Sequence, residues 1–308
     1  MTAAAPRLPS IALVTPSFNQ AQFIAATVQS VLSQDYPHLD YLISDGASTD
    51  NTVSILQQLD RQHPGRFRWY SRKDTGQSDA IGAAIAQTTG DILGWLNSDD
   101  TLAPGALSTV GEFFAANPNI DVVYGRADFI DAAGNFLCPC AHIEPWSVSR
   151  LRGYSDFIVQ PACFFRRSAF DAVGGIDRDL HYAMDYDLWL KLAAHHTFAH
   201  IPTVLAHYRW VGQNKSAVGG WGRLNEISTL VARHHLPDTP AFFRLEAVNM
   251  HLQEARAALA AGRYGDAIGS FAKASWQVLP SRRAWVALSQ PLTWRVIHTG
   301  KILRKAGR

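Results

Sequence analysis

Cysteine and charge are both scarce in this sequence. Three cysteines in 308 residues are too few for a disulfide scaffold, and the Cys138-Pro139-Cys140 spacing is not that of a CxxC redox motif or a zinc knuckle. Reduced thiols in a cytoplasmic protein are therefore expected. Charged residues make up 18% of the chain and apolar residues 47%, which excludes a disordered or coiled-coil chain and allows a large core.

Several targeting and ligand-binding patterns are also missing. Residues 1–10 lack the apolar core of a secretory signal, and prolines at 9 and 16 interrupt the uncharged stretch 8–34, so no membrane span is expected. Neither GxGxxG nor GxxxxGK[ST] occurs, which argues against Rossmann dehydrogenases and P-loop enzymes. A diphosphate ligand would then need a bound divalent cation to offset its charge.

Strand-like and helix-like patterns alternate along the first 130 residues. Helical spacing of apolar residues separates the strand-like runs, and Asn19 is placed to cap the first helix. This order predicts βαβ units and a parallel sheet, in which ligands bind beyond the carboxyl ends of the strands. The predicted strands are residues 10–15, 41–44, 67–70, 92–96 and 122–130.

Carboxylates follow three of these strands. Asp45 comes after the second strand, Asp79 lies near the loop after the third, and Asp99 and Asp100 follow the fourth. Taken singly, Asp79 could cap a helix and the Asp99-Asp100 pair could open a turn. Taken together at one sheet edge, they predict a cation or sugar-nucleotide site, because paired acids repel unless a cation or protons neutralise them.

A further pair of acids opens a predicted helix in the second half of the chain. Asp185 lies at the expected helix start and Asp187 in its first turn, ahead of the apolar residues Leu188, Trp189 and Leu192. Asp187 is interpreted as a capping residue that complements the helix dipole. Asp185 remains a candidate for chemistry.

Seven short blocks occur in order over about two-thirds of the chain. They are TPSFNQ (15–20), SDGASTDNT (44–52), GQSDAI (76–81), GWLNSDD (94–100), QPACFFRR (160–167), residues 174–193 and HYRW (207–210). In this order and spacing they resemble the family 2 glycosyltransferases, and in particular bacterial surface-glycan enzymes that carry a WLNSDD block. The resemblance implies the GT-A fold, an α/β fold with a mostly parallel central sheet flanked by helices, here with a C-terminal helical extension.

The resemblance also implies a role for individual residues. Asp99, with Asp100 nearby, would bind a divalent cation, Mg²⁺ or Mn²⁺, on the donor diphosphate. Asp185 would be the general base of a single inverting displacement. The residues implied in binding the donor nucleotide are Pro16, Asp45, Gln77, Asp79 and Ser98.

The chain departs from the family pattern at four places. Asn97 replaces the first acid of the DxD motif, and Met184 replaces the glutamate of the ED motif. Residues 82–84 are Gly-Ala-Ala where many relatives carry Asn-Lys-Gly, so a lysine contact to the diphosphate is lost. Val211 stands where relatives often place a histidine that approaches the metal. Nucleotide binding is therefore better supported than the metal shell.

The C-terminal part differs in charge from the rest. Residues 241–308 contain 11 Lys/Arg and 3 Asp/Glu, whereas the first 240 residues contain 17 and 23. We predict a catalytic domain over 1–236 and a helical extension over 237–308, with helices at 242–261 and 266–279 that resemble one tetratricopeptide unit. Residues 281–308, with seven Lys/Arg, no acid and interleaved aromatics, suit an anionic membrane surface or pack on the body. The acidic body argues against nucleic-acid binding.

These observations predict transfer of a sugar from a nucleotide-sugar donor to a glycan or lipid-linked acceptor, in surface polysaccharide synthesis. The enzyme would be cytoplasmic, at the inner face of a membrane. Asn97, Met184 and Val211 leave open a non-catalytic nucleotide-sugar-binding or scaffolding subunit. A nucleotidyltransferase is a weaker alternative, since no basic, glycine-rich triphosphate loop follows the first strand.

Overall fold

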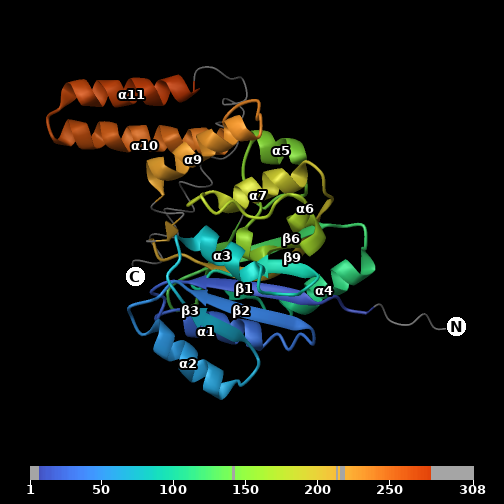
Figure 1. Ribbon diagram of the computed structural model, residues 1–308. Helices are drawn as coiled ribbons and strands as arrows, with labels where there is room; N and C mark the ends of the chain where they lie inside the picture. Colours follow the sequence, from blue (N-terminus) through green and yellow to red (C-terminus); the bar gives the residue numbers. More distant parts are fainter. Residues whose placement is uncertain (1–6, 141–142, 213, 216–218, 279–308) are drawn as a thin grey trace. The chain divides into compact units, whose positions relative to one another are not determined.

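The computed structural model describes residues 7–140, 143–212, 214–215 and 219–278 (Figure 1). Contacts group them into two compact units. One comprises residues up to 146 together with 157–211, and the other comprises 147–156 and 212 onward. The predicted domain boundary at 236 stays a prediction, and the predicted membrane-binding segment 281–308 lies outside the described residues. Among the helices described, none combines the length and apolarity needed to span a bilayer.

The first unit is built on one mixed sheet. Its order is β3-β2-β1-β4-β8-β6-β9-β5, with β7 paired to β6. Strands β3, β2, β1 and β4 are mutually parallel, as the βαβ pattern predicts, while β8 runs antiparallel to both of its neighbours. The strands are β1 (Ile11–Ser17), β2 (Leu39–Asp45), β3 (Arg68–Ser71), β4 (Ile92–Trp95), β5 (Thr101–Leu102), β6 (Val122–Ile130), β7 (Phe136–Pro139), β8 (Cys163–Arg166) and β9 (Phe198–Arg209).

Helices cover both faces of this sheet. In Figure 1, α1 and α2 lie on one face of strands β1–β3 and α3 on the other. The helices of this unit are α1 (Ile24–Leu32), α2 (Thr52–Gln62), α3 (Gln77–Ile85), α4 (Ala106–Ala116), α6 (Arg167–Ala172) and α7 (Met184–Ala193). The second unit contains α5 (Val148–Gly153), α9 (Gly220–Arg233), α10 (Ala241–Ala260) and α11 (Tyr264–Val278).

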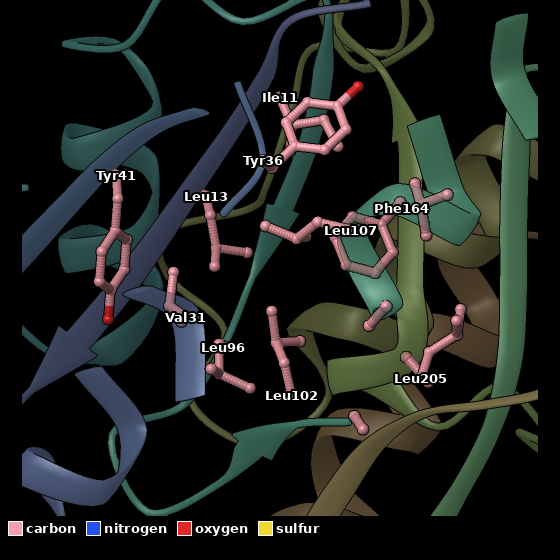
Figure 2. Packing of buried hydrophobic residues seen from close by; sticks show 14 of the residues in the cluster. Ile11, Leu13, Val31, Tyr36, Tyr41, Leu96, Leu102, Leu107, Phe164 and Leu205 are labelled. Carbon is pink, nitrogen blue, oxygen red and sulfur yellow. The ribbon is translucent and has the colours of Figure 1, made fainter. Parts of the chain in front are cut away.

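Side chains along a strand point alternately to the two faces of the sheet, so buried residues pack on both faces. Ile11 and Leu13 of β1 belong to a cluster with Val31 of α1 and Leu107 of α4 (Figure 2). Each fully buried aliphatic side chain of this kind contributes about 1.5–3 kcal/mol by leaving water. Elsewhere in the sheet, Trp95 of β4 stacks on Trp189 of α7 with ring centroids 5.7 Å apart. This stacking fixes α7, and with it Asp185, relative to the sheet.

The expected capping role of Asn19 is wrong. Helix α1 begins at Ile24 with Phe23 in the cap position, whereas Asn19 adopts the left-handed conformation with φ 53°. Its Oδ1 accepts a hydrogen bond from the Thr49 backbone N–H at 2.8 Å. Asparagine tolerates this conformation because its short side chain bonds to nearby backbone. Asn19 therefore ties together the loops that follow β1 and β2.

Candidate active site

Asp45 ends β2 and its side chain is completely buried. One carboxylate oxygen accepts hydrogen bonds from the Ser48 backbone N–H (3.0 Å) and the Ser71 hydroxyl (2.6 Å), and the other accepts from the Ser48 hydroxyl. The carboxylate thus fixes the loop after β2 against the end of β3. Buried acids need such donors, because an unpaired buried charge is costly.

Asp74, which sequence reasoning left without a role, lies against this loop. A Cβ atom at Gly46 would come within 2.7 Å of Asp74 Oδ2, so a larger residue at position 46 would push this carboxylate away. Burial raises the pKa of Asp74, the Gly76 backbone N–H lowers it in part, and the carboxylates of Asp79 and Asp45 raise it further. Three acids therefore approach one another beyond β2 and β3, and two of them, Asp45 and Asp79, are acids that the sheet-edge argument places there.

The end of β1 contributes two side chains that sequence reasoning missed. Ser17 pairs in register with Asp45, and its buried hydroxyl has no hydrogen-bond partner in the part of the chain described. The next residue, Phe18, is a large aromatic left 58% exposed. Pro16, the predicted nucleotide-binding residue, pairs with Ser44 on the same edge. An aromatic that follows a buried strand among polar residues is the signal that could have identified Phe18.

The turn after β4 is held by a chain of side-chain hydrogen bonds. Gln77 Nε2 donates to Asn97 Oδ1 at 2.8 Å, and Asn97 Nδ2 donates to Asp100 Oδ2 at 3.3 Å. An amide can do both, because it carries a donor and an acceptor. An aspartate at position 97 could accept from Gln77 but would repel Asp100. Asn97, the residue that departs from the DxD pattern, is therefore part of the hydrogen bonding that holds this turn.

Arg209, at the end of β9, clamps the same turn from the other side. Its backbone N–H donates to Asp100 Oδ1 (2.9 Å), its Nε to the Asp99 carbonyl (2.7 Å) and its Nη1 to the Asp131 carbonyl (2.8 Å). Only 3% of the residue is exposed, and burial lowers the pKa of its guanidinium. Thr27 Oγ1 of α1 lies 2.9 Å from the carbonyl oxygen of Ser98. Arg209 lies in the HYRW block (207–210), but sequence reasoning gave this arginine no role of its own.

The two adjacent acids of the turn are not equivalent. Asp100 is 1% exposed with both oxygens bonded, whereas the Asp99 side chain is half-buried. Burial raises the pKa of Asp100 well above its usual value, and the neighbouring Asp99 carboxylate adds to the rise. Within the described ranges, no group of three His, Cys, Asp or Glu side chains is arranged so that it could hold a metal ion. The predicted assignment of Asp99 and Asp100 to a Mg²⁺ or Mn²⁺ ion therefore stays a prediction; an ion of this kind can draw its other ligands from substrate phosphates and water.

The segment that leads into α7 lies along the first turn of α3. Arg178 Nη1 is 3.3 Å from Asp79 Oδ1, and the Ser78 hydroxyl donates to the Leu180 carbonyl. A Cβ atom at Gly76 would meet His181 Nδ1 at 3.9 Å. Because Gln77 on the same turn reaches Asn97, the structure brings together the β4 turn, the start of α3 and the approach to Asp185.

Arg178 also lies beside the helix position at which many resembled relatives carry a lysine. Its side chain crosses Gly82 so closely that a Cβ atom there would lie 2.9 Å from Arg178 Nε. Ala83 occupies the position of the lysine that many resembled relatives carry. The Arg178 side chain, from a segment distant in sequence, thus reaches α3, the helix that lacks the lysine.

Asp185 and Asp187 have different surroundings. Asp187 is completely buried, and its Oδ2 lies 3.0 Å from Lys191 Nζ, one turn along α7. Ala183 occupies the N-cap position and the helix has no side-chain capping bond, so the capping part of the Asp187 interpretation is wrong. Its place in the first turn, where a carboxylate complements the helix dipole, is confirmed. The ion pair replaces the capping bond, because a buried carboxylate needs a counter-charge. Asp185 is half-buried, and its Oδ1 accepts from the Tyr186 N–H at 2.8 Å.

Comparison with known proteins identifies the family. The model of the family described as "Glycosyl transferase family 2" matches residues 12–174. Chondroitin synthase of Escherichia coli is 31% identical over 211 residues, which cover 68% of this chain and 30% of that protein. The chain spans less than a third of the length of this and other curated relatives. It belongs to glycosyl transferase family 2.

Solved structures agree on the fold. TarS of S. aureus (residues 1–349), in complex with UDP-GlcNAc, superposes with a TM-score of 0.60 at 14% identity, covering 86% of this chain and 81% of that one. The mannosyltransferase PcManGT of Pyrobaculum calidifontis, in complex with GDP-Man and Mn²⁺, gives 0.56 at 18% identity, covering 97% and 87%. These likenesses confirm the predicted GT-A fold.

Proposed function

We propose that this member of glycosyl transferase family 2 is an inverting glycosyltransferase. It moves a sugar from a nucleotide-sugar donor to a hydroxyl of a glycan or lipid-linked acceptor, in surface polysaccharide synthesis at the inner face of a membrane. The observation that carries the proposal is the chain of contacts from Arg209 through Asp100, Asn97 and Gln77 to the start of α3. That chain sets an accessible acid, Asp99, beside the segment that leads to Asp185.

The donor nucleotide would bind along the carboxyl ends of β1 and β2. Exposed Phe18 offers a ring on which a base can stack, and such stacking contributes about 1–3 kcal/mol per base. The Ser17 hydroxyl is an available donor or acceptor beside Asp45. Asp45 shapes this pocket through its bonds to Ser48 and Ser71. Pro16, Gln77, Asp79 and Ser98 complete the residues assigned to the donor.

The diphosphate would lie between the β4 turn and Arg178. Asp99 would hold the divalent cation, which offsets charge on the leaving diphosphate when it is bound. Asp100 orders the turn behind it. Arg178, whose side chain is 53% exposed, supplies a second positive charge that can turn from Asp79 to a phosphate oxygen. An exposed pair of this kind contributes little to stability, so Arg178 is not needed for folding.

Asp185 would act as the general base. Its carboxylate takes the proton from the acceptor hydroxyl as that oxygen attacks the anomeric carbon, opposite the departing nucleoside diphosphate. Asp187 cannot take this role, because it is completely buried against Lys191. The stacking of Trp189 on Trp95 fixes the helix that carries the base.

A binding and turnover screen tests the proposal. Calorimetry with a panel of nucleoside diphosphates, with and without Mn²⁺, should show metal-dependent binding in the intact chain and its loss in Asp99→Ala. Donor consumption is then measured with candidate glycan and lipid-linked acceptors. Binding without turnover for every acceptor would support the non-catalytic subunit instead. Equal nucleotide affinity in Asp99→Ala would remove the metal assignment.

A further inference from the structure

Three consecutive backbone carbonyl groups surround Asp99, and side chains from two distant elements bind all of them. The Thr27 hydroxyl of α1 lies 2.9 Å from the Ser98 carbonyl oxygen and 2.7 Å from the Asp100 carbonyl oxygen. The carbonyl oxygen of Asp99 itself accepts a hydrogen bond from Nε of Arg209 at the end of β9. The backbone is therefore held before and after Asp99 by α1, and at Asp99 by β9.

Thr27 belongs to a polar stripe along one side of α1. We call Thr27, Ser30 and Gln34 the α1 stripe, because their spacing of three and four residues makes them neighbours along the helix, with Gln34 just beyond its end. The Ser30 hydroxyl accepts a hydrogen bond from the Leu102 backbone N–H at 3.1 Å. Gln34 Nε2 donates to the Ala103 carbonyl oxygen at 3.0 Å. The α1 stripe therefore continues the attachment from the β4 turn along β5.

The Thr27 hydroxyl is directed to the β4 turn rather than to its own helix. A threonine within a helix commonly donates to a carbonyl group of the preceding helical turn. Here that group, the Phe23 carbonyl, lies 3.5 Å from Thr27 Oγ1, whereas both carbonyl oxygens of the β4 turn are nearer. Thr27 is also completely buried. A valine would fill much the same space but could not donate, so the hydroxyl is what distinguishes threonine at this position.

We propose that Thr27 is a positioning residue of the donor site. Its hydroxyl holds the backbone on either side of Asp99, and this sets the Asp99 carboxylate for the cation of the donor diphosphate. The inference rests on the proposed function, in which Asp99 faces the donor. Because Thr27 is completely buried, it acts on the donor through the β4 turn alone. Residues that hold a metal-binding side chain in place typically contribute about 10–100-fold in metal affinity or activity.

Calorimetry on the full chain tests this with Thr27→Val, which keeps the branched shape and removes the hydroxyl. The probes are UDP, GDP, CDP, ADP and dTDP in the presence of Mn²⁺, together with the matching nucleosides. For each nucleoside diphosphate that the wild type binds, Thr27→Val should weaken binding at least about tenfold and leave affinity for the nucleoside unchanged. Thr27→Ser retains the hydroxyl and should bind the diphosphate nearly as well as the wild type.

Amide hydrogen exchange supplies a readout that needs no ligand. Thr27→Val should speed exchange in peptides covering residues 97–103 and leave the rest of the sheet unchanged, because local opening follows the loss of local bonds. Thr88→Val is the matched control. Thr88 is also buried, and its hydroxyl donates to the Ile85 carbonyl oxygen at 2.7 Å, at the opposite end of α3 from Gln77. This control should lower the melting temperature without changing affinity for the diphosphate.

The outcomes separate this inference from the proposed function. A wild-type chain that binds none of the nucleoside diphosphates overturns both. Equal diphosphate affinity in the wild type and Thr27→Val, or unchanged exchange over residues 97–103, overturns the positioning role alone. An equal loss in Thr27→Ser and Thr27→Val also overturns it, because the effect would then come from packing of the methyl group. If Thr27→Val does not fold, Ser30→Ala replaces it: a loss of diphosphate affinity supports the role of the α1 stripe, and an unchanged affinity overturns it.

Discussion

The carboxyl edge of the sheet and the α10–α11 hairpin differ in the kind of side chain that each buries. At the sheet edge, polar groups are buried and bonded to one another, as Asp100 is to Asn97 and Arg209. In the hairpin, alanines are buried and aromatics such as Phe271 are exposed. The first region is organised before any ligand arrives. The second exposes apolar area among the residues that the structure describes.

The largest expected effect is on the transfer rate, when Asp185, the proposed general base, is replaced. Asp185→Asn keeps the size of the side chain and should leave folding and donor affinity unchanged. Proton abstraction is lost, so the transfer rate should fall by a factor on the order of a hundred to ten thousand. Single-turnover kinetics with saturating donor measure the fall, and a thermal melt checks the fold.

Asp187→Asn is the matched variant for that experiment. It leaves Lys191 without its buried counter-charge, so it should lower the melting temperature. A variant at Asp185 that turned over at the wild-type rate would place the base on another residue. A melting temperature that fell for Asp185→Asn rather than for Asp187→Asn would reverse the two assignments.

Asn97→Asp tests whether the turn is built around an amide. The substitution restores the family's acid but sets a carboxylate against Asp100, and it removes the bond that Asn97 donates. We expect a loss of about 1–3 kcal/mol in the free energy of unfolding. Denaturant titration measures it, with Asn119→Asp, an exposed site, as control. A neutral result at position 97, equal to the control, would mean that the amide bridge contributes nothing.

The sequence predicts the parallel half of the sheet and the convergence of its acids, but not how each acid is used. Periodicity places Asp45, Asp99 and Asp185 at the ends of elements, and this is a local property. The hydrogen bond between Asp100 and Arg209 joins residues 109 positions apart, so it depends on the sheet order. Asn19 was mistaken for a cap because its bond to Thr49 is also non-local.

Arg178→Gln should weaken diphosphate binding selectively. A charge-assisted hydrogen bond contributes about 1.5–3 kcal/mol, so we expect roughly tenfold or greater loss of nucleoside diphosphate affinity. Affinity for the uncharged nucleoside should not change. Calorimetry with UDP against uridine, and GDP against guanosine, separates the two effects.

Arg68→Gln is the control for Arg178. The Arg68–Asp40 pair has side-chain exposures of 55% and 23%, against 53% and 25% for Arg178–Asp79, but it lies at the amino ends of β3 and β2. Equal losses in both variants would indicate a general charge effect. An equal loss of nucleoside and nucleoside diphosphate affinity in Arg178→Gln would mean that Arg178 acts through Asp79 on the nucleoside pocket.

Replacing one glycine in each region, Gly82 of α3 and Gly269 of α11, should have the smallest effect on stability. Around Gly269 of α11 no described atom outside the helix's own backbone and the neighbouring residues lies within 4 Å of an added Cβ, whereas at Gly82 of α3 the added atom would strike Arg178. Gly269→Ala should therefore raise the free energy of unfolding by about 0.5–1 kcal/mol, because alanine loses less backbone entropy in a helix. Gly82→Ala should instead displace Arg178 and reproduce the diphosphate defect of Arg178→Gln. Thermal melts and UDP or GDP calorimetry on the two variants decide the matter. If Gly82→Ala stabilised the protein and left diphosphate affinity intact, the close approach of Arg178 to α3 would have no part in donor binding.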